Sequence, residues 1–291
     1  MTTLTNHDKP ISIVSSTNEN FAPHLATLLC SLLDKNNAPF HFYIIDDGLS
    51  LRSKLLLNRT ISSYNKAVIS YISVDASLFE NMVESNRIPQ TAYYRIAIPN
   101  LITDPDVERI IYLDCDMLVM DSIEELWGMD LEEHLLGAVE DAGFHHRLET
   151  MGIPFQSSRY FNSGLMVLDL EKWRQEQISE KVLQFAHDFP KKLKFHDQDA
   201  LNAILHDRWT PLHPKWNAQT YMMLKEKVHP TLLGHLQYRE ARKSPSIIHF
   251  CGHEKPWMGI SCHPFASYYH HYRSKTAFDY EPITIQDYVE G

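Results

Sequence analysis

The sequence predicts one α/β domain with a mostly parallel central sheet and helices on both of its faces. Short apolar runs typical of buried strands alternate with segments whose apolar residues recur at helical spacing. The chain has 291 residues, 44% of them hydrophobic, which is enough for a sizeable core. It shows no internal repeat and no low-complexity linker, so a single domain is the simplest organisation.

The elements are expected to begin with a strand, a polar loop and a helix. The first strand gives way to a polar run at residues 15–20, and Ser50 is placed to cap the helix after the second strand. Strands are expected over residues 11–14, 40–45, 67–74, 110–113, 135–139, 165–170 and 246–250. Helices are expected over residues 21–33, 51–61, 90–98, 171–189, 200–205 and 263–276. Residues 209–243 contain three prolines and no clear period, which predicts irregular structure.

The central strand at residues 110–113 leads directly into two carboxylates, Asp114 and Asp116. If the strand continues through them, both side chains point to one face and Cys115 points to the other. Two convergent carboxylates make half of a cation site. An ordinary turn that contains two aspartates is the alternative.

The loops after the strands are the expected location of a ligand site, because ligands of parallel sheets bind beyond the carboxyl ends of the strands. A divalent ion such as Mn2+ or Mg2+ takes about six ligands, mainly oxygens, and Mn2+ accepts an imidazole more readily. Of the 17 histidines, His249 is the best further ligand, since it ends an apolar strand. Lys255, in the glycine loop that follows, supplies a charge suited to a diphosphate. A packed core histidine and a surface lysine are the alternatives.

Further candidates stand at other element ends. Asp197 and Gln198 open the helix at residues 200–205, where acidic residues also serve simply as good helix N-terminal residues. Arg95 lies in the expected helix at residues 90–98 and is either a functional group or an ordinary exposed charge. Asp141 follows the apolar run at residues 135–139, where a strand would end.

Composition and motifs exclude several classes of protein. The formal charge of −10 argues against nucleic-acid partners and general binding to anionic membranes, although peripheral membrane contact stays open. The chain lacks the glycine motifs of dinucleotide and P-loop sites. Four scattered cysteines without C-x-x-C spacing indicate reduced thiols. With neither a signal peptide nor a membrane-spanning stretch, a cytoplasmic protein is expected, and the acidic end of the chain offers no anchor.

Four blocks in order resemble glycosyltransferase family 8, a group of retaining, UDP-sugar-dependent enzymes that includes bacterial surface-sugar transferases and glycogenin-like proteins. The blocks read YLDCDMLV, YFNSGLMVLDLEKWR, HDQDALN and HFCGHEKPW. The resemblance implies a Rossmann-like GT-A domain over residues 11–275, with its D-x-D motif at a strand end. Residues 11–120 would form the nucleotide-binding half and residues 121–262 the donor-sugar and acceptor half. Residues 1–10 would be an N-terminal extension and residues 263–291 a C-terminal helix and tail.

The same resemblance implies a role for each matching residue. Asp114, Asp116 and His249 would bind Mn2+, or else Mg2+, against the diphosphate, which Gly252 and Lys255 would hold. Arg95, Asp141, Asn162 and Asp197 would contact the donor hexose, and Gln198 would lie beneath the anomeric carbon, so Gln198 and Asp197 are the catalytic candidates. Ser15, Ser16, Asn18 and Asn20 would take the uridine, and Cys115 is either a nucleotide contact or a core thiol. The family commonly has Asp where Asn18 stands, and alanines near Ser16 and Thr17.

The implied reaction is transfer of glucose or galactose from UDP to a glycan, a lipid-linked glycan or a glycoprotein, with retention of anomeric configuration. Gln198 is neutral and hence a poor nucleophile, so front-face attack by the acceptor suits it better than a double displacement. A nucleotidyltransferase of sugar nucleotides is one alternative, but it usually needs a glycine-rich basic first loop. A non-catalytic protein that binds UDP-sugars is the other.

Overall fold

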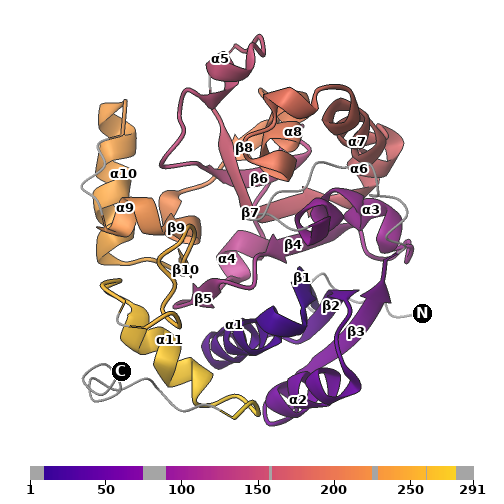
Figure 1. The fold of residues 1–291 in the computed structure, drawn as a ribbon, viewed down its shortest axis with the longest axis vertical. Helices are drawn as coiled ribbons and strands as arrows, with labels where there is room; N and C mark the ends of the chain where they lie inside the picture. Colours follow the sequence, from indigo (N-terminus) through magenta and orange to yellow (C-terminus); the bar gives the residue numbers. More distant parts are fainter. Residues whose placement is uncertain (1–9, 75–89, 157–158, 225–228, 260, 280–291) are drawn as a thin grey trace.

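The computed structural model describes residues 10–74, 90–156, 159–224, 229–259 and 261–279 (Figure 1). Residues 1–9 of the expected N-terminal extension and residues 280–291 of the expected tail lie outside these ranges. The described chain forms a mixed α/β structure around a seven-stranded sheet. The predicted fold class is therefore confirmed.

The seven-stranded sheet has the order β3-β2-β1-β4-β7-β6-β8. Only β7 runs antiparallel to its neighbours, β4 and β6; the other adjacent pairs in this sheet are parallel. The strands are β1 (Ile11–Asn18), β2 (Phe40–Asp47), β3 (Ala67–Ser73), β4 (Arg109–Leu113), β6 (Leu136–Glu140), β7 (Phe161–Asp169) and β8 (Trp209–Pro211). A mostly parallel sheet is what the alternation of strands and helices predicts.

Helices cover both faces of the sheet (Figure 1). On one face, α1 (Ala22–Lys35) and α2 (Leu51–Ser62) pack on residues such as Ile13 and Phe42. On the other, η3 (Gln90–Ala97), α3 (Ile98–Leu101), α6 (Leu170–Gln175), α7 (Ile178–Asp188) and α8 (His196–Leu205) pack on residues such as Tyr112 and Met166. Both faces of the central strands are thus buried, and this explains their nearly continuous apolar runs. Ser50 caps α2 as predicted, because its side chain accepts a hydrogen bond from the Ser53 amide.

A second, three-stranded sheet lies beside the first and completes the edge where the strands end. Its order is β5 (Met117–Val119), β10 (Ile247–His249) and β9 (Ala218–Gln219). In the chain, α9 (Thr220–Leu224) and α10 (Leu232–Lys243) lie between β9 and β10, and α11 (Ala266–Arg273) follows β10. The shorter elements are η1 (Glu19–Phe21), α4 (Glu124–Trp127), α5 (Arg147–Met151), η4 (Pro190–Lys192) and η5 (Pro214–Asn217).

Several predicted boundaries are wrong for identifiable reasons. The polar residues 15–18 continue β1, because they pair in register with β2 as far as Asn18 and Asp47. Residues 171–189 form two helices, since the left-handed backbone of Gln177 (φ 53°) separates α6 from α7. Residues 209–243 are not irregular: α10 occupies the last third. Its buried face consists of Gly234, Tyr238 and Ala241 while its leucines face outward, so its apolar pattern does not mark a core face.

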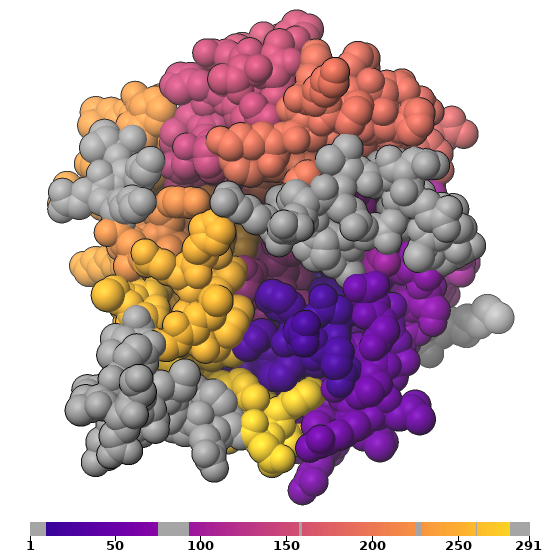
Figure 2. Space-filling model, viewed as in Figure 1, coloured from indigo at the N-terminus to yellow at the C-terminus, as the bar shows by residue number. Residues whose placement is uncertain are grey.

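The C-terminal helix α11 packs onto the body of the domain. Tyr269 and Tyr272 join a buried cluster with Cys30 of α1 and Phe250. In Figure 2 this yellow C-terminal segment lies against the indigo N-terminal segment, and His24 stacks on Trp257 with ring centroids 3.7 Å apart. Among the helices of the described ranges, none is long and apolar enough to span a bilayer.

Candidate active site

An open cavity of about 670 Å3 lies where β1, β4, β7 and β10 approach one another, a size suited to a small-molecule ligand. The first turn of α8 and the loop after β10 contribute to its wall. The predicted site residues that line it are Ser16, Asn18, Arg95, Asp114, Cys115, Asp116, Asp141, Asn162, Asp197, Gln198, His249, Gly252 and Lys255. The structure thus brings together residues from almost the full length of the chain.

Two predicted uridine contacts do not belong to this lining as the described residues define it. The Ser15 side chain is fully buried, and its Oγ donates a hydrogen bond to the Leu113 carbonyl oxygen at 2.8 Å. Asn20 lies on η1 and is exposed. Asn18 lines the cavity, but its Oδ1 accepts a hydrogen bond from the Phe21 amide at 3.2 Å, which caps η1.

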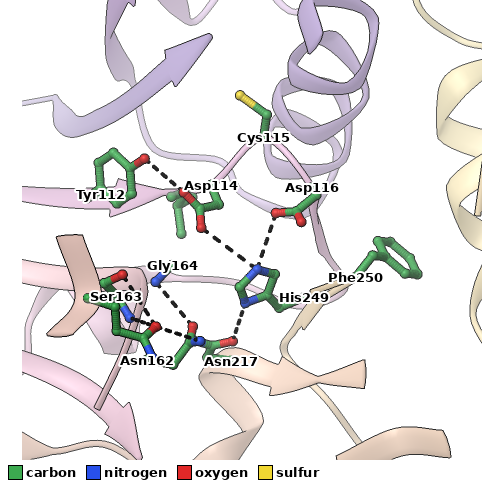
Figure 3. Close-up of polar contacts among 12 residues, drawn as sticks. Tyr112, Asp114, Cys115, Asp116, Asn162, Ser163, Gly164, Asn217, His249 and Phe250 are labelled. Atoms are coloured by element: carbon green, nitrogen blue, oxygen red, sulfur yellow. Dashed lines mark hydrogen bonds and ion pairs between the residues drawn. The ribbon is translucent and has the colours of Figure 1, made fainter. Parts of the chain in front are cut away.

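The carboxylates of Asp114 and Asp116 converge on His249 (Figure 3). The strand β4 ends at Leu113, so the two aspartates lie in a turn rather than in a continued strand. His249 Nε2 lies 3.2 Å from Asp116 Oδ1 and 3.8 Å from Asp114 Oδ2. Cys115 still points away from them, although the strand on which that prediction rested does not continue, and its Sγ donates to the Ser16 carbonyl oxygen at 3.0 Å.

A chain of amide groups fixes the orientation and tautomer of His249. The Asn162 Oδ1 accepts from the Gly164 amide at 3.2 Å and from Asn217 Nδ2 at 2.9 Å. The Asn217 Oδ1 therefore faces His249 Nδ1, at 3.0 Å, and that ring nitrogen carries the proton. In this tautomer the lone pair of Nε2 faces the two carboxylates, so three electron-pair donors converge. A divalent cation fits this donor set.

Gly164 makes the close approach of these groups possible. A Cβ atom at this position would lie 2.4 Å from His249 Cε1 and 2.8 Å from Asp114 Oδ2. Only glycine leaves room for both side chains. Asn217 and Gly164 were both missed by the sequence reasoning about the metal site, although Gly164 falls within one of the quoted motif blocks.

Lys255 places a positive charge next to Asp116. Its Nζ contacts the Asp116 carboxylate and donates to the Phe250 carbonyl oxygen at 2.6 Å. Burial alone would raise the pKa of Asp116, but the Lys255 ammonium holds that pKa well below its ordinary value. Gly252, which lies in the loop between Phe250 and Lys255, has a left-handed backbone with φ +85°.

Arg95 is buried in the cavity wall and is not an exposed helix charge. Its guanidinium pairs with Asp114 at 3.0 Å and with Asp197 at 3.1 Å, and it stacks over the Tyr112 ring at 4.8 Å. Burial raises the pKa of Asp197 to about 6, although Arg95 opposes this shift. The arginine thereby links the strand end of β4 to the first turn of α8.

Gln198 is held by the polar groups of β7 and by Asp141. Its Oε1 accepts from the Ser163 amide at 3.1 Å and from Asn162 Nδ2 at 3.2 Å. Its Nε2 donates to Asp141 Oδ2 at 3.0 Å. Both amide ends are thus fixed, so the side chain has a defined position in the cavity. Asp199 lies outside this group and pairs with Arg147 at 2.6 Å.

Part of the lining was not anticipated from the sequence. Phe144 and Phe195 meet with ring centroids 4.3 Å apart, and Lys194 Nζ lies 5.3 and 5.1 Å from these rings. The other residues that sequence reasoning missed are Thr17, Phe21, Ser163, Gly164, Gln219, Tyr221, Cys251 and His253. Ser163, Gly164, Cys251 and His253 stand within the motif blocks given above and had the clearest signal. Thr17, Phe21, Gln219 and Tyr221 lie on β1, η1, β9 and α9, outside those blocks.

A solved structure with the same architecture defines the fold class. The galactosyltransferase LgtC, crystallised with donor and acceptor sugar analogues, superposes with a TM-score of 0.81 over 93% of this chain and 98% of that chain, at 23% identity. The fold is therefore that of a GT-A type glycosyltransferase.

Sequence comparison then gives the family. The sequence model described as "Glycosyl transferase family 8" matches residues 12–261. "General stress protein A" of Bacillus subtilis (strain 168) is 45% identical over 276 residues, which are 94% of this chain and 96% of that protein. The "Lipopolysaccharide 1,2-glucosyltransferase" of Escherichia coli is 27% identical over 257 residues, covering 86% of this chain and 74% of that protein. The chain belongs to glycosyltransferase family 8.

Proposed function

We propose that this protein is a Mn2+-dependent retaining hexosyltransferase that transfers glucose or galactose from a UDP-sugar to a hydroxyl group. The acceptor class is a glycan, a lipid-linked glycan or a glycoprotein. The observation that carries the proposal is the convergence of Asp114, Asp116 and Nε2 of His249, with Lys255 beside them. Two carboxylates, one imidazole and a cation suit a metal and a diphosphate together.

The contacts within the cavity support a separate role for each group of residues. Asp114, Asp116 and His249 would hold Mn2+, with Mg2+ as the other candidate, and the bound ion would neutralise charge on the departing diphosphate. Lys255 would leave Asp116 to meet a phosphate oxygen, and the backbone of Gly252 would approach the same group. Residues 11–120 would form the nucleotide-binding half of the domain, with Ser16, Asn18 and Cys115 near the uridine.

The donor hexose would lie against the polar wall made by residues 121–262 and Arg95. Asp141, Asn162 and Asp197 supply hydrogen-bonding groups there, and Gln198 would lie beneath the anomeric carbon. The Gln198 carbonyl oxygen can stabilise positive charge on that carbon, but as part of a neutral amide it is a weak nucleophile. We therefore favour front-face attack by the acceptor, with the departing phosphate oxygen as base. A glycosyl adduct trapped on Gln198 would contradict this.

The acceptor would approach past the aromatic rim formed by Phe144, Phe195 and Tyr221. Apolar ring faces suit the C–H faces of a sugar, and Phe144 meets Tyr221 edge to face at 6.3 Å. We place the reaction in the cytoplasm, because all four cysteines are free thiols, which favours a reducing compartment.

A panel of UDP-sugars tests the proposal directly. Purified protein is incubated with UDP-glucose, UDP-galactose and their N-acetyl counterparts in Mn2+, and UDP release is measured. We expect release from a hexose donor, loss of it in EDTA, and at least a hundredfold decrease in Asp116→Ala. The exposed Asp106→Ala is the matched control and should keep full activity.

The outcome also separates the alternatives. A non-catalytic binding protein would bind UDP-sugars without releasing UDP. A nucleotidyltransferase would release pyrophosphate from a nucleoside triphosphate and a sugar phosphate instead. Release of UDP from no donor by folded protein would contradict the proposal.

A further inference from the structure

The rim of the cavity carries a positive charge that is not neutralised within the described part of the chain. The lysine and arginine side chains of the described lining are Arg95, Lys194 and Lys255. Arg95 pairs with two aspartates, and Lys255 contacts a third. Lys194 is exposed, and among the described residues no carboxylate forms an ion pair with it. Its charge is therefore available to a ligand.

Two aromatic rings keep the Lys194 ammonium at the rim. Its Nζ lies 5.3 Å from the centroid of the Phe144 ring and 5.1 Å from that of the Phe195 ring. The two rings meet with their centroids 4.3 Å apart. The negative face of an aromatic ring attracts a cation without using its N–H groups in ordinary hydrogen bonds. The rings thus restrict a flexible side chain and leave its donors free for an anion.

The backbone beneath Lys194 is fixed by a buried carboxylate. Asp199 of α8 is fully buried, and its Oδ2 accepts from the Lys194 amide at 2.6 Å and from the Phe195 amide at 2.9 Å. The Tyr160 hydroxyl donates to Asp199 Oδ1 at 2.7 Å. The next residue, His196, has a left-handed backbone with φ 43°, which is costly outside glycine and is found where the surrounding structure enforces it. The segment is a rigid base for the charge at the rim.

The Lys194 charge lies away from the loop that would hold the diphosphate. Phe144, which contacts Lys194, meets Tyr221 edge to face at 6.3 Å. A Cβ atom at Gly252 would lie 3.6 Å from the Tyr221 hydroxyl oxygen. Phe144 and Tyr221 therefore connect Lys194 to this loop and separate the two. Lys194 belongs to the part of the rim past which the acceptor would approach.

The charges of the donor side leave Lys194 without a task there. Asp114 and Asp116 would face the metal, and Lys255 would face the diphosphate. The chemistry around Lys194 is that of a charged sugar, because aromatic faces suit the C–H groups of the ring and an ammonium suits a phosphate or a carboxylate.

We propose that Lys194 selects an acceptor that carries a phosphate or carboxylate group on or next to its accepting sugar. This inference rests on the proposed transferase function and names the chemical class of its acceptor. The sugar would lie against Phe144 and Phe195, and its anionic group would pair with Lys194 Nζ. Lys194 determines specificity in this arrangement and takes no part in bond breaking.

Matched charged and neutral sugars test the site in the full-length protein. Protein loaded with Mn2+ and UDP is titrated with glucose, glucose 6-phosphate and glucuronate. We expect the charged sugars to bind about 5- to 20-fold more tightly than glucose, and the tighter of the two identifies the anionic group. Lys194→Met removes the charge but keeps an apolar stem, so it should abolish the preference, whereas Lys194→Arg should keep most of it. Lys191→Met is the matched control, because Lys191 is an exposed lysine of η4 outside the described lining.

Transfer kinetics then show where Lys194 acts. With a charged acceptor, Lys194→Met should raise the KM for the acceptor about 5- to 20-fold, and Lys191→Met should not. A raised KM for the UDP-sugar instead would place Lys194 at the diphosphate and overturn the proposal. It is also overturned if the wild type binds the charged sugars no more tightly than glucose, binds none of the three, or keeps its preference in Lys194→Met. UDP release from the donor panel without acceptor reports the transferase function by itself, so its failure is distinguishable from these outcomes.

Discussion

Replacing Gly164 with alanine perturbs the proposed Mn2+ site without touching a ligand atom. The new methyl group would lie 2.4 Å from His249 Cε1 and 2.8 Å from Asp114 Oδ2. Contacts of this kind are normally about 3.4 Å or longer, so His249 would have to move by about 1 Å. The amide chain through Asn217 and Asn162 opposes that movement.

The expected size of the effect follows from the cost of overpacking. Inserting one methyl group into a well-packed region costs about 1–3 kcal/mol. If the strain is relieved by separating His249 from Asp114, the same free energy appears as roughly 5- to 150-fold weaker metal binding. Strain that is not relieved appears as a lower Tm. We therefore expect weaker Mn2+ binding, lower activity and a modest loss of stability.

Isothermal titration measures the change in Mn2+ affinity, and thermal unfolding separately measures the loss of stability. Gly128→Ala is the matched control, because a Cβ there meets only backbone oxygens at 3.5 and 4.0 Å and its φ of −80° suits alanine. This control should be as stable as the wild type or up to ~1 kcal/mol more stable. If Gly164→Ala binds Mn2+ within twofold of the wild type and unfolds at the same temperature, the added methyl group does not disturb His249 and the expectation is refuted.

Three further perturbations give measurable outcomes. Asn217→Ala frees the ring of His249, so Mn2+ affinity by titration should fall about 10- to 100-fold, and an unchanged affinity would contradict the amide chain. The raised pKa of Asp197, about 6, means that the folded state holds its proton more tightly than the unfolded state. In EDTA the wild type should therefore lose up to roughly 3 kcal/mol of stability relative to Asp197→Asn as pH rises from about 4 to 6, and parallel pH curves would refute this. Gln177→Gly should stabilise the protein by ~1 kcal/mol in urea unfolding, whereas Gln175→Gly within α6 should destabilise it.

The sequence alone identified most elements of the sheet and the residues at their ends. The strands β2 and β4 have nearly continuous apolar runs, because helices cover both of their faces, and such runs are visible without a structure. Asp114, Asp116 and His249 follow or end such apolar runs, so the sequence also located them at strand ends. Elements whose stability depends on partners elsewhere were misjudged. Residues 15–18 extend β1 only because β2 pairs with them, and the buried face of α10, Gly234, Tyr238 and Ala241, forms no apolar stripe.

Tertiary structure decided what the polar residues around these strand ends do. Arg95 is buried and pairs with two aspartates, and the Ser15 side chain points into the core. Asn217 orients His249, although it lies in a segment whose sequence has no period. Such roles depend on which side chains meet across long separations in the chain, and local patterns do not encode those distances. The sequence by itself therefore determined the chemistry available at the sheet edge. Only the packing of β7, β9 and β10 against β4 and β5 decided how that chemistry is arranged.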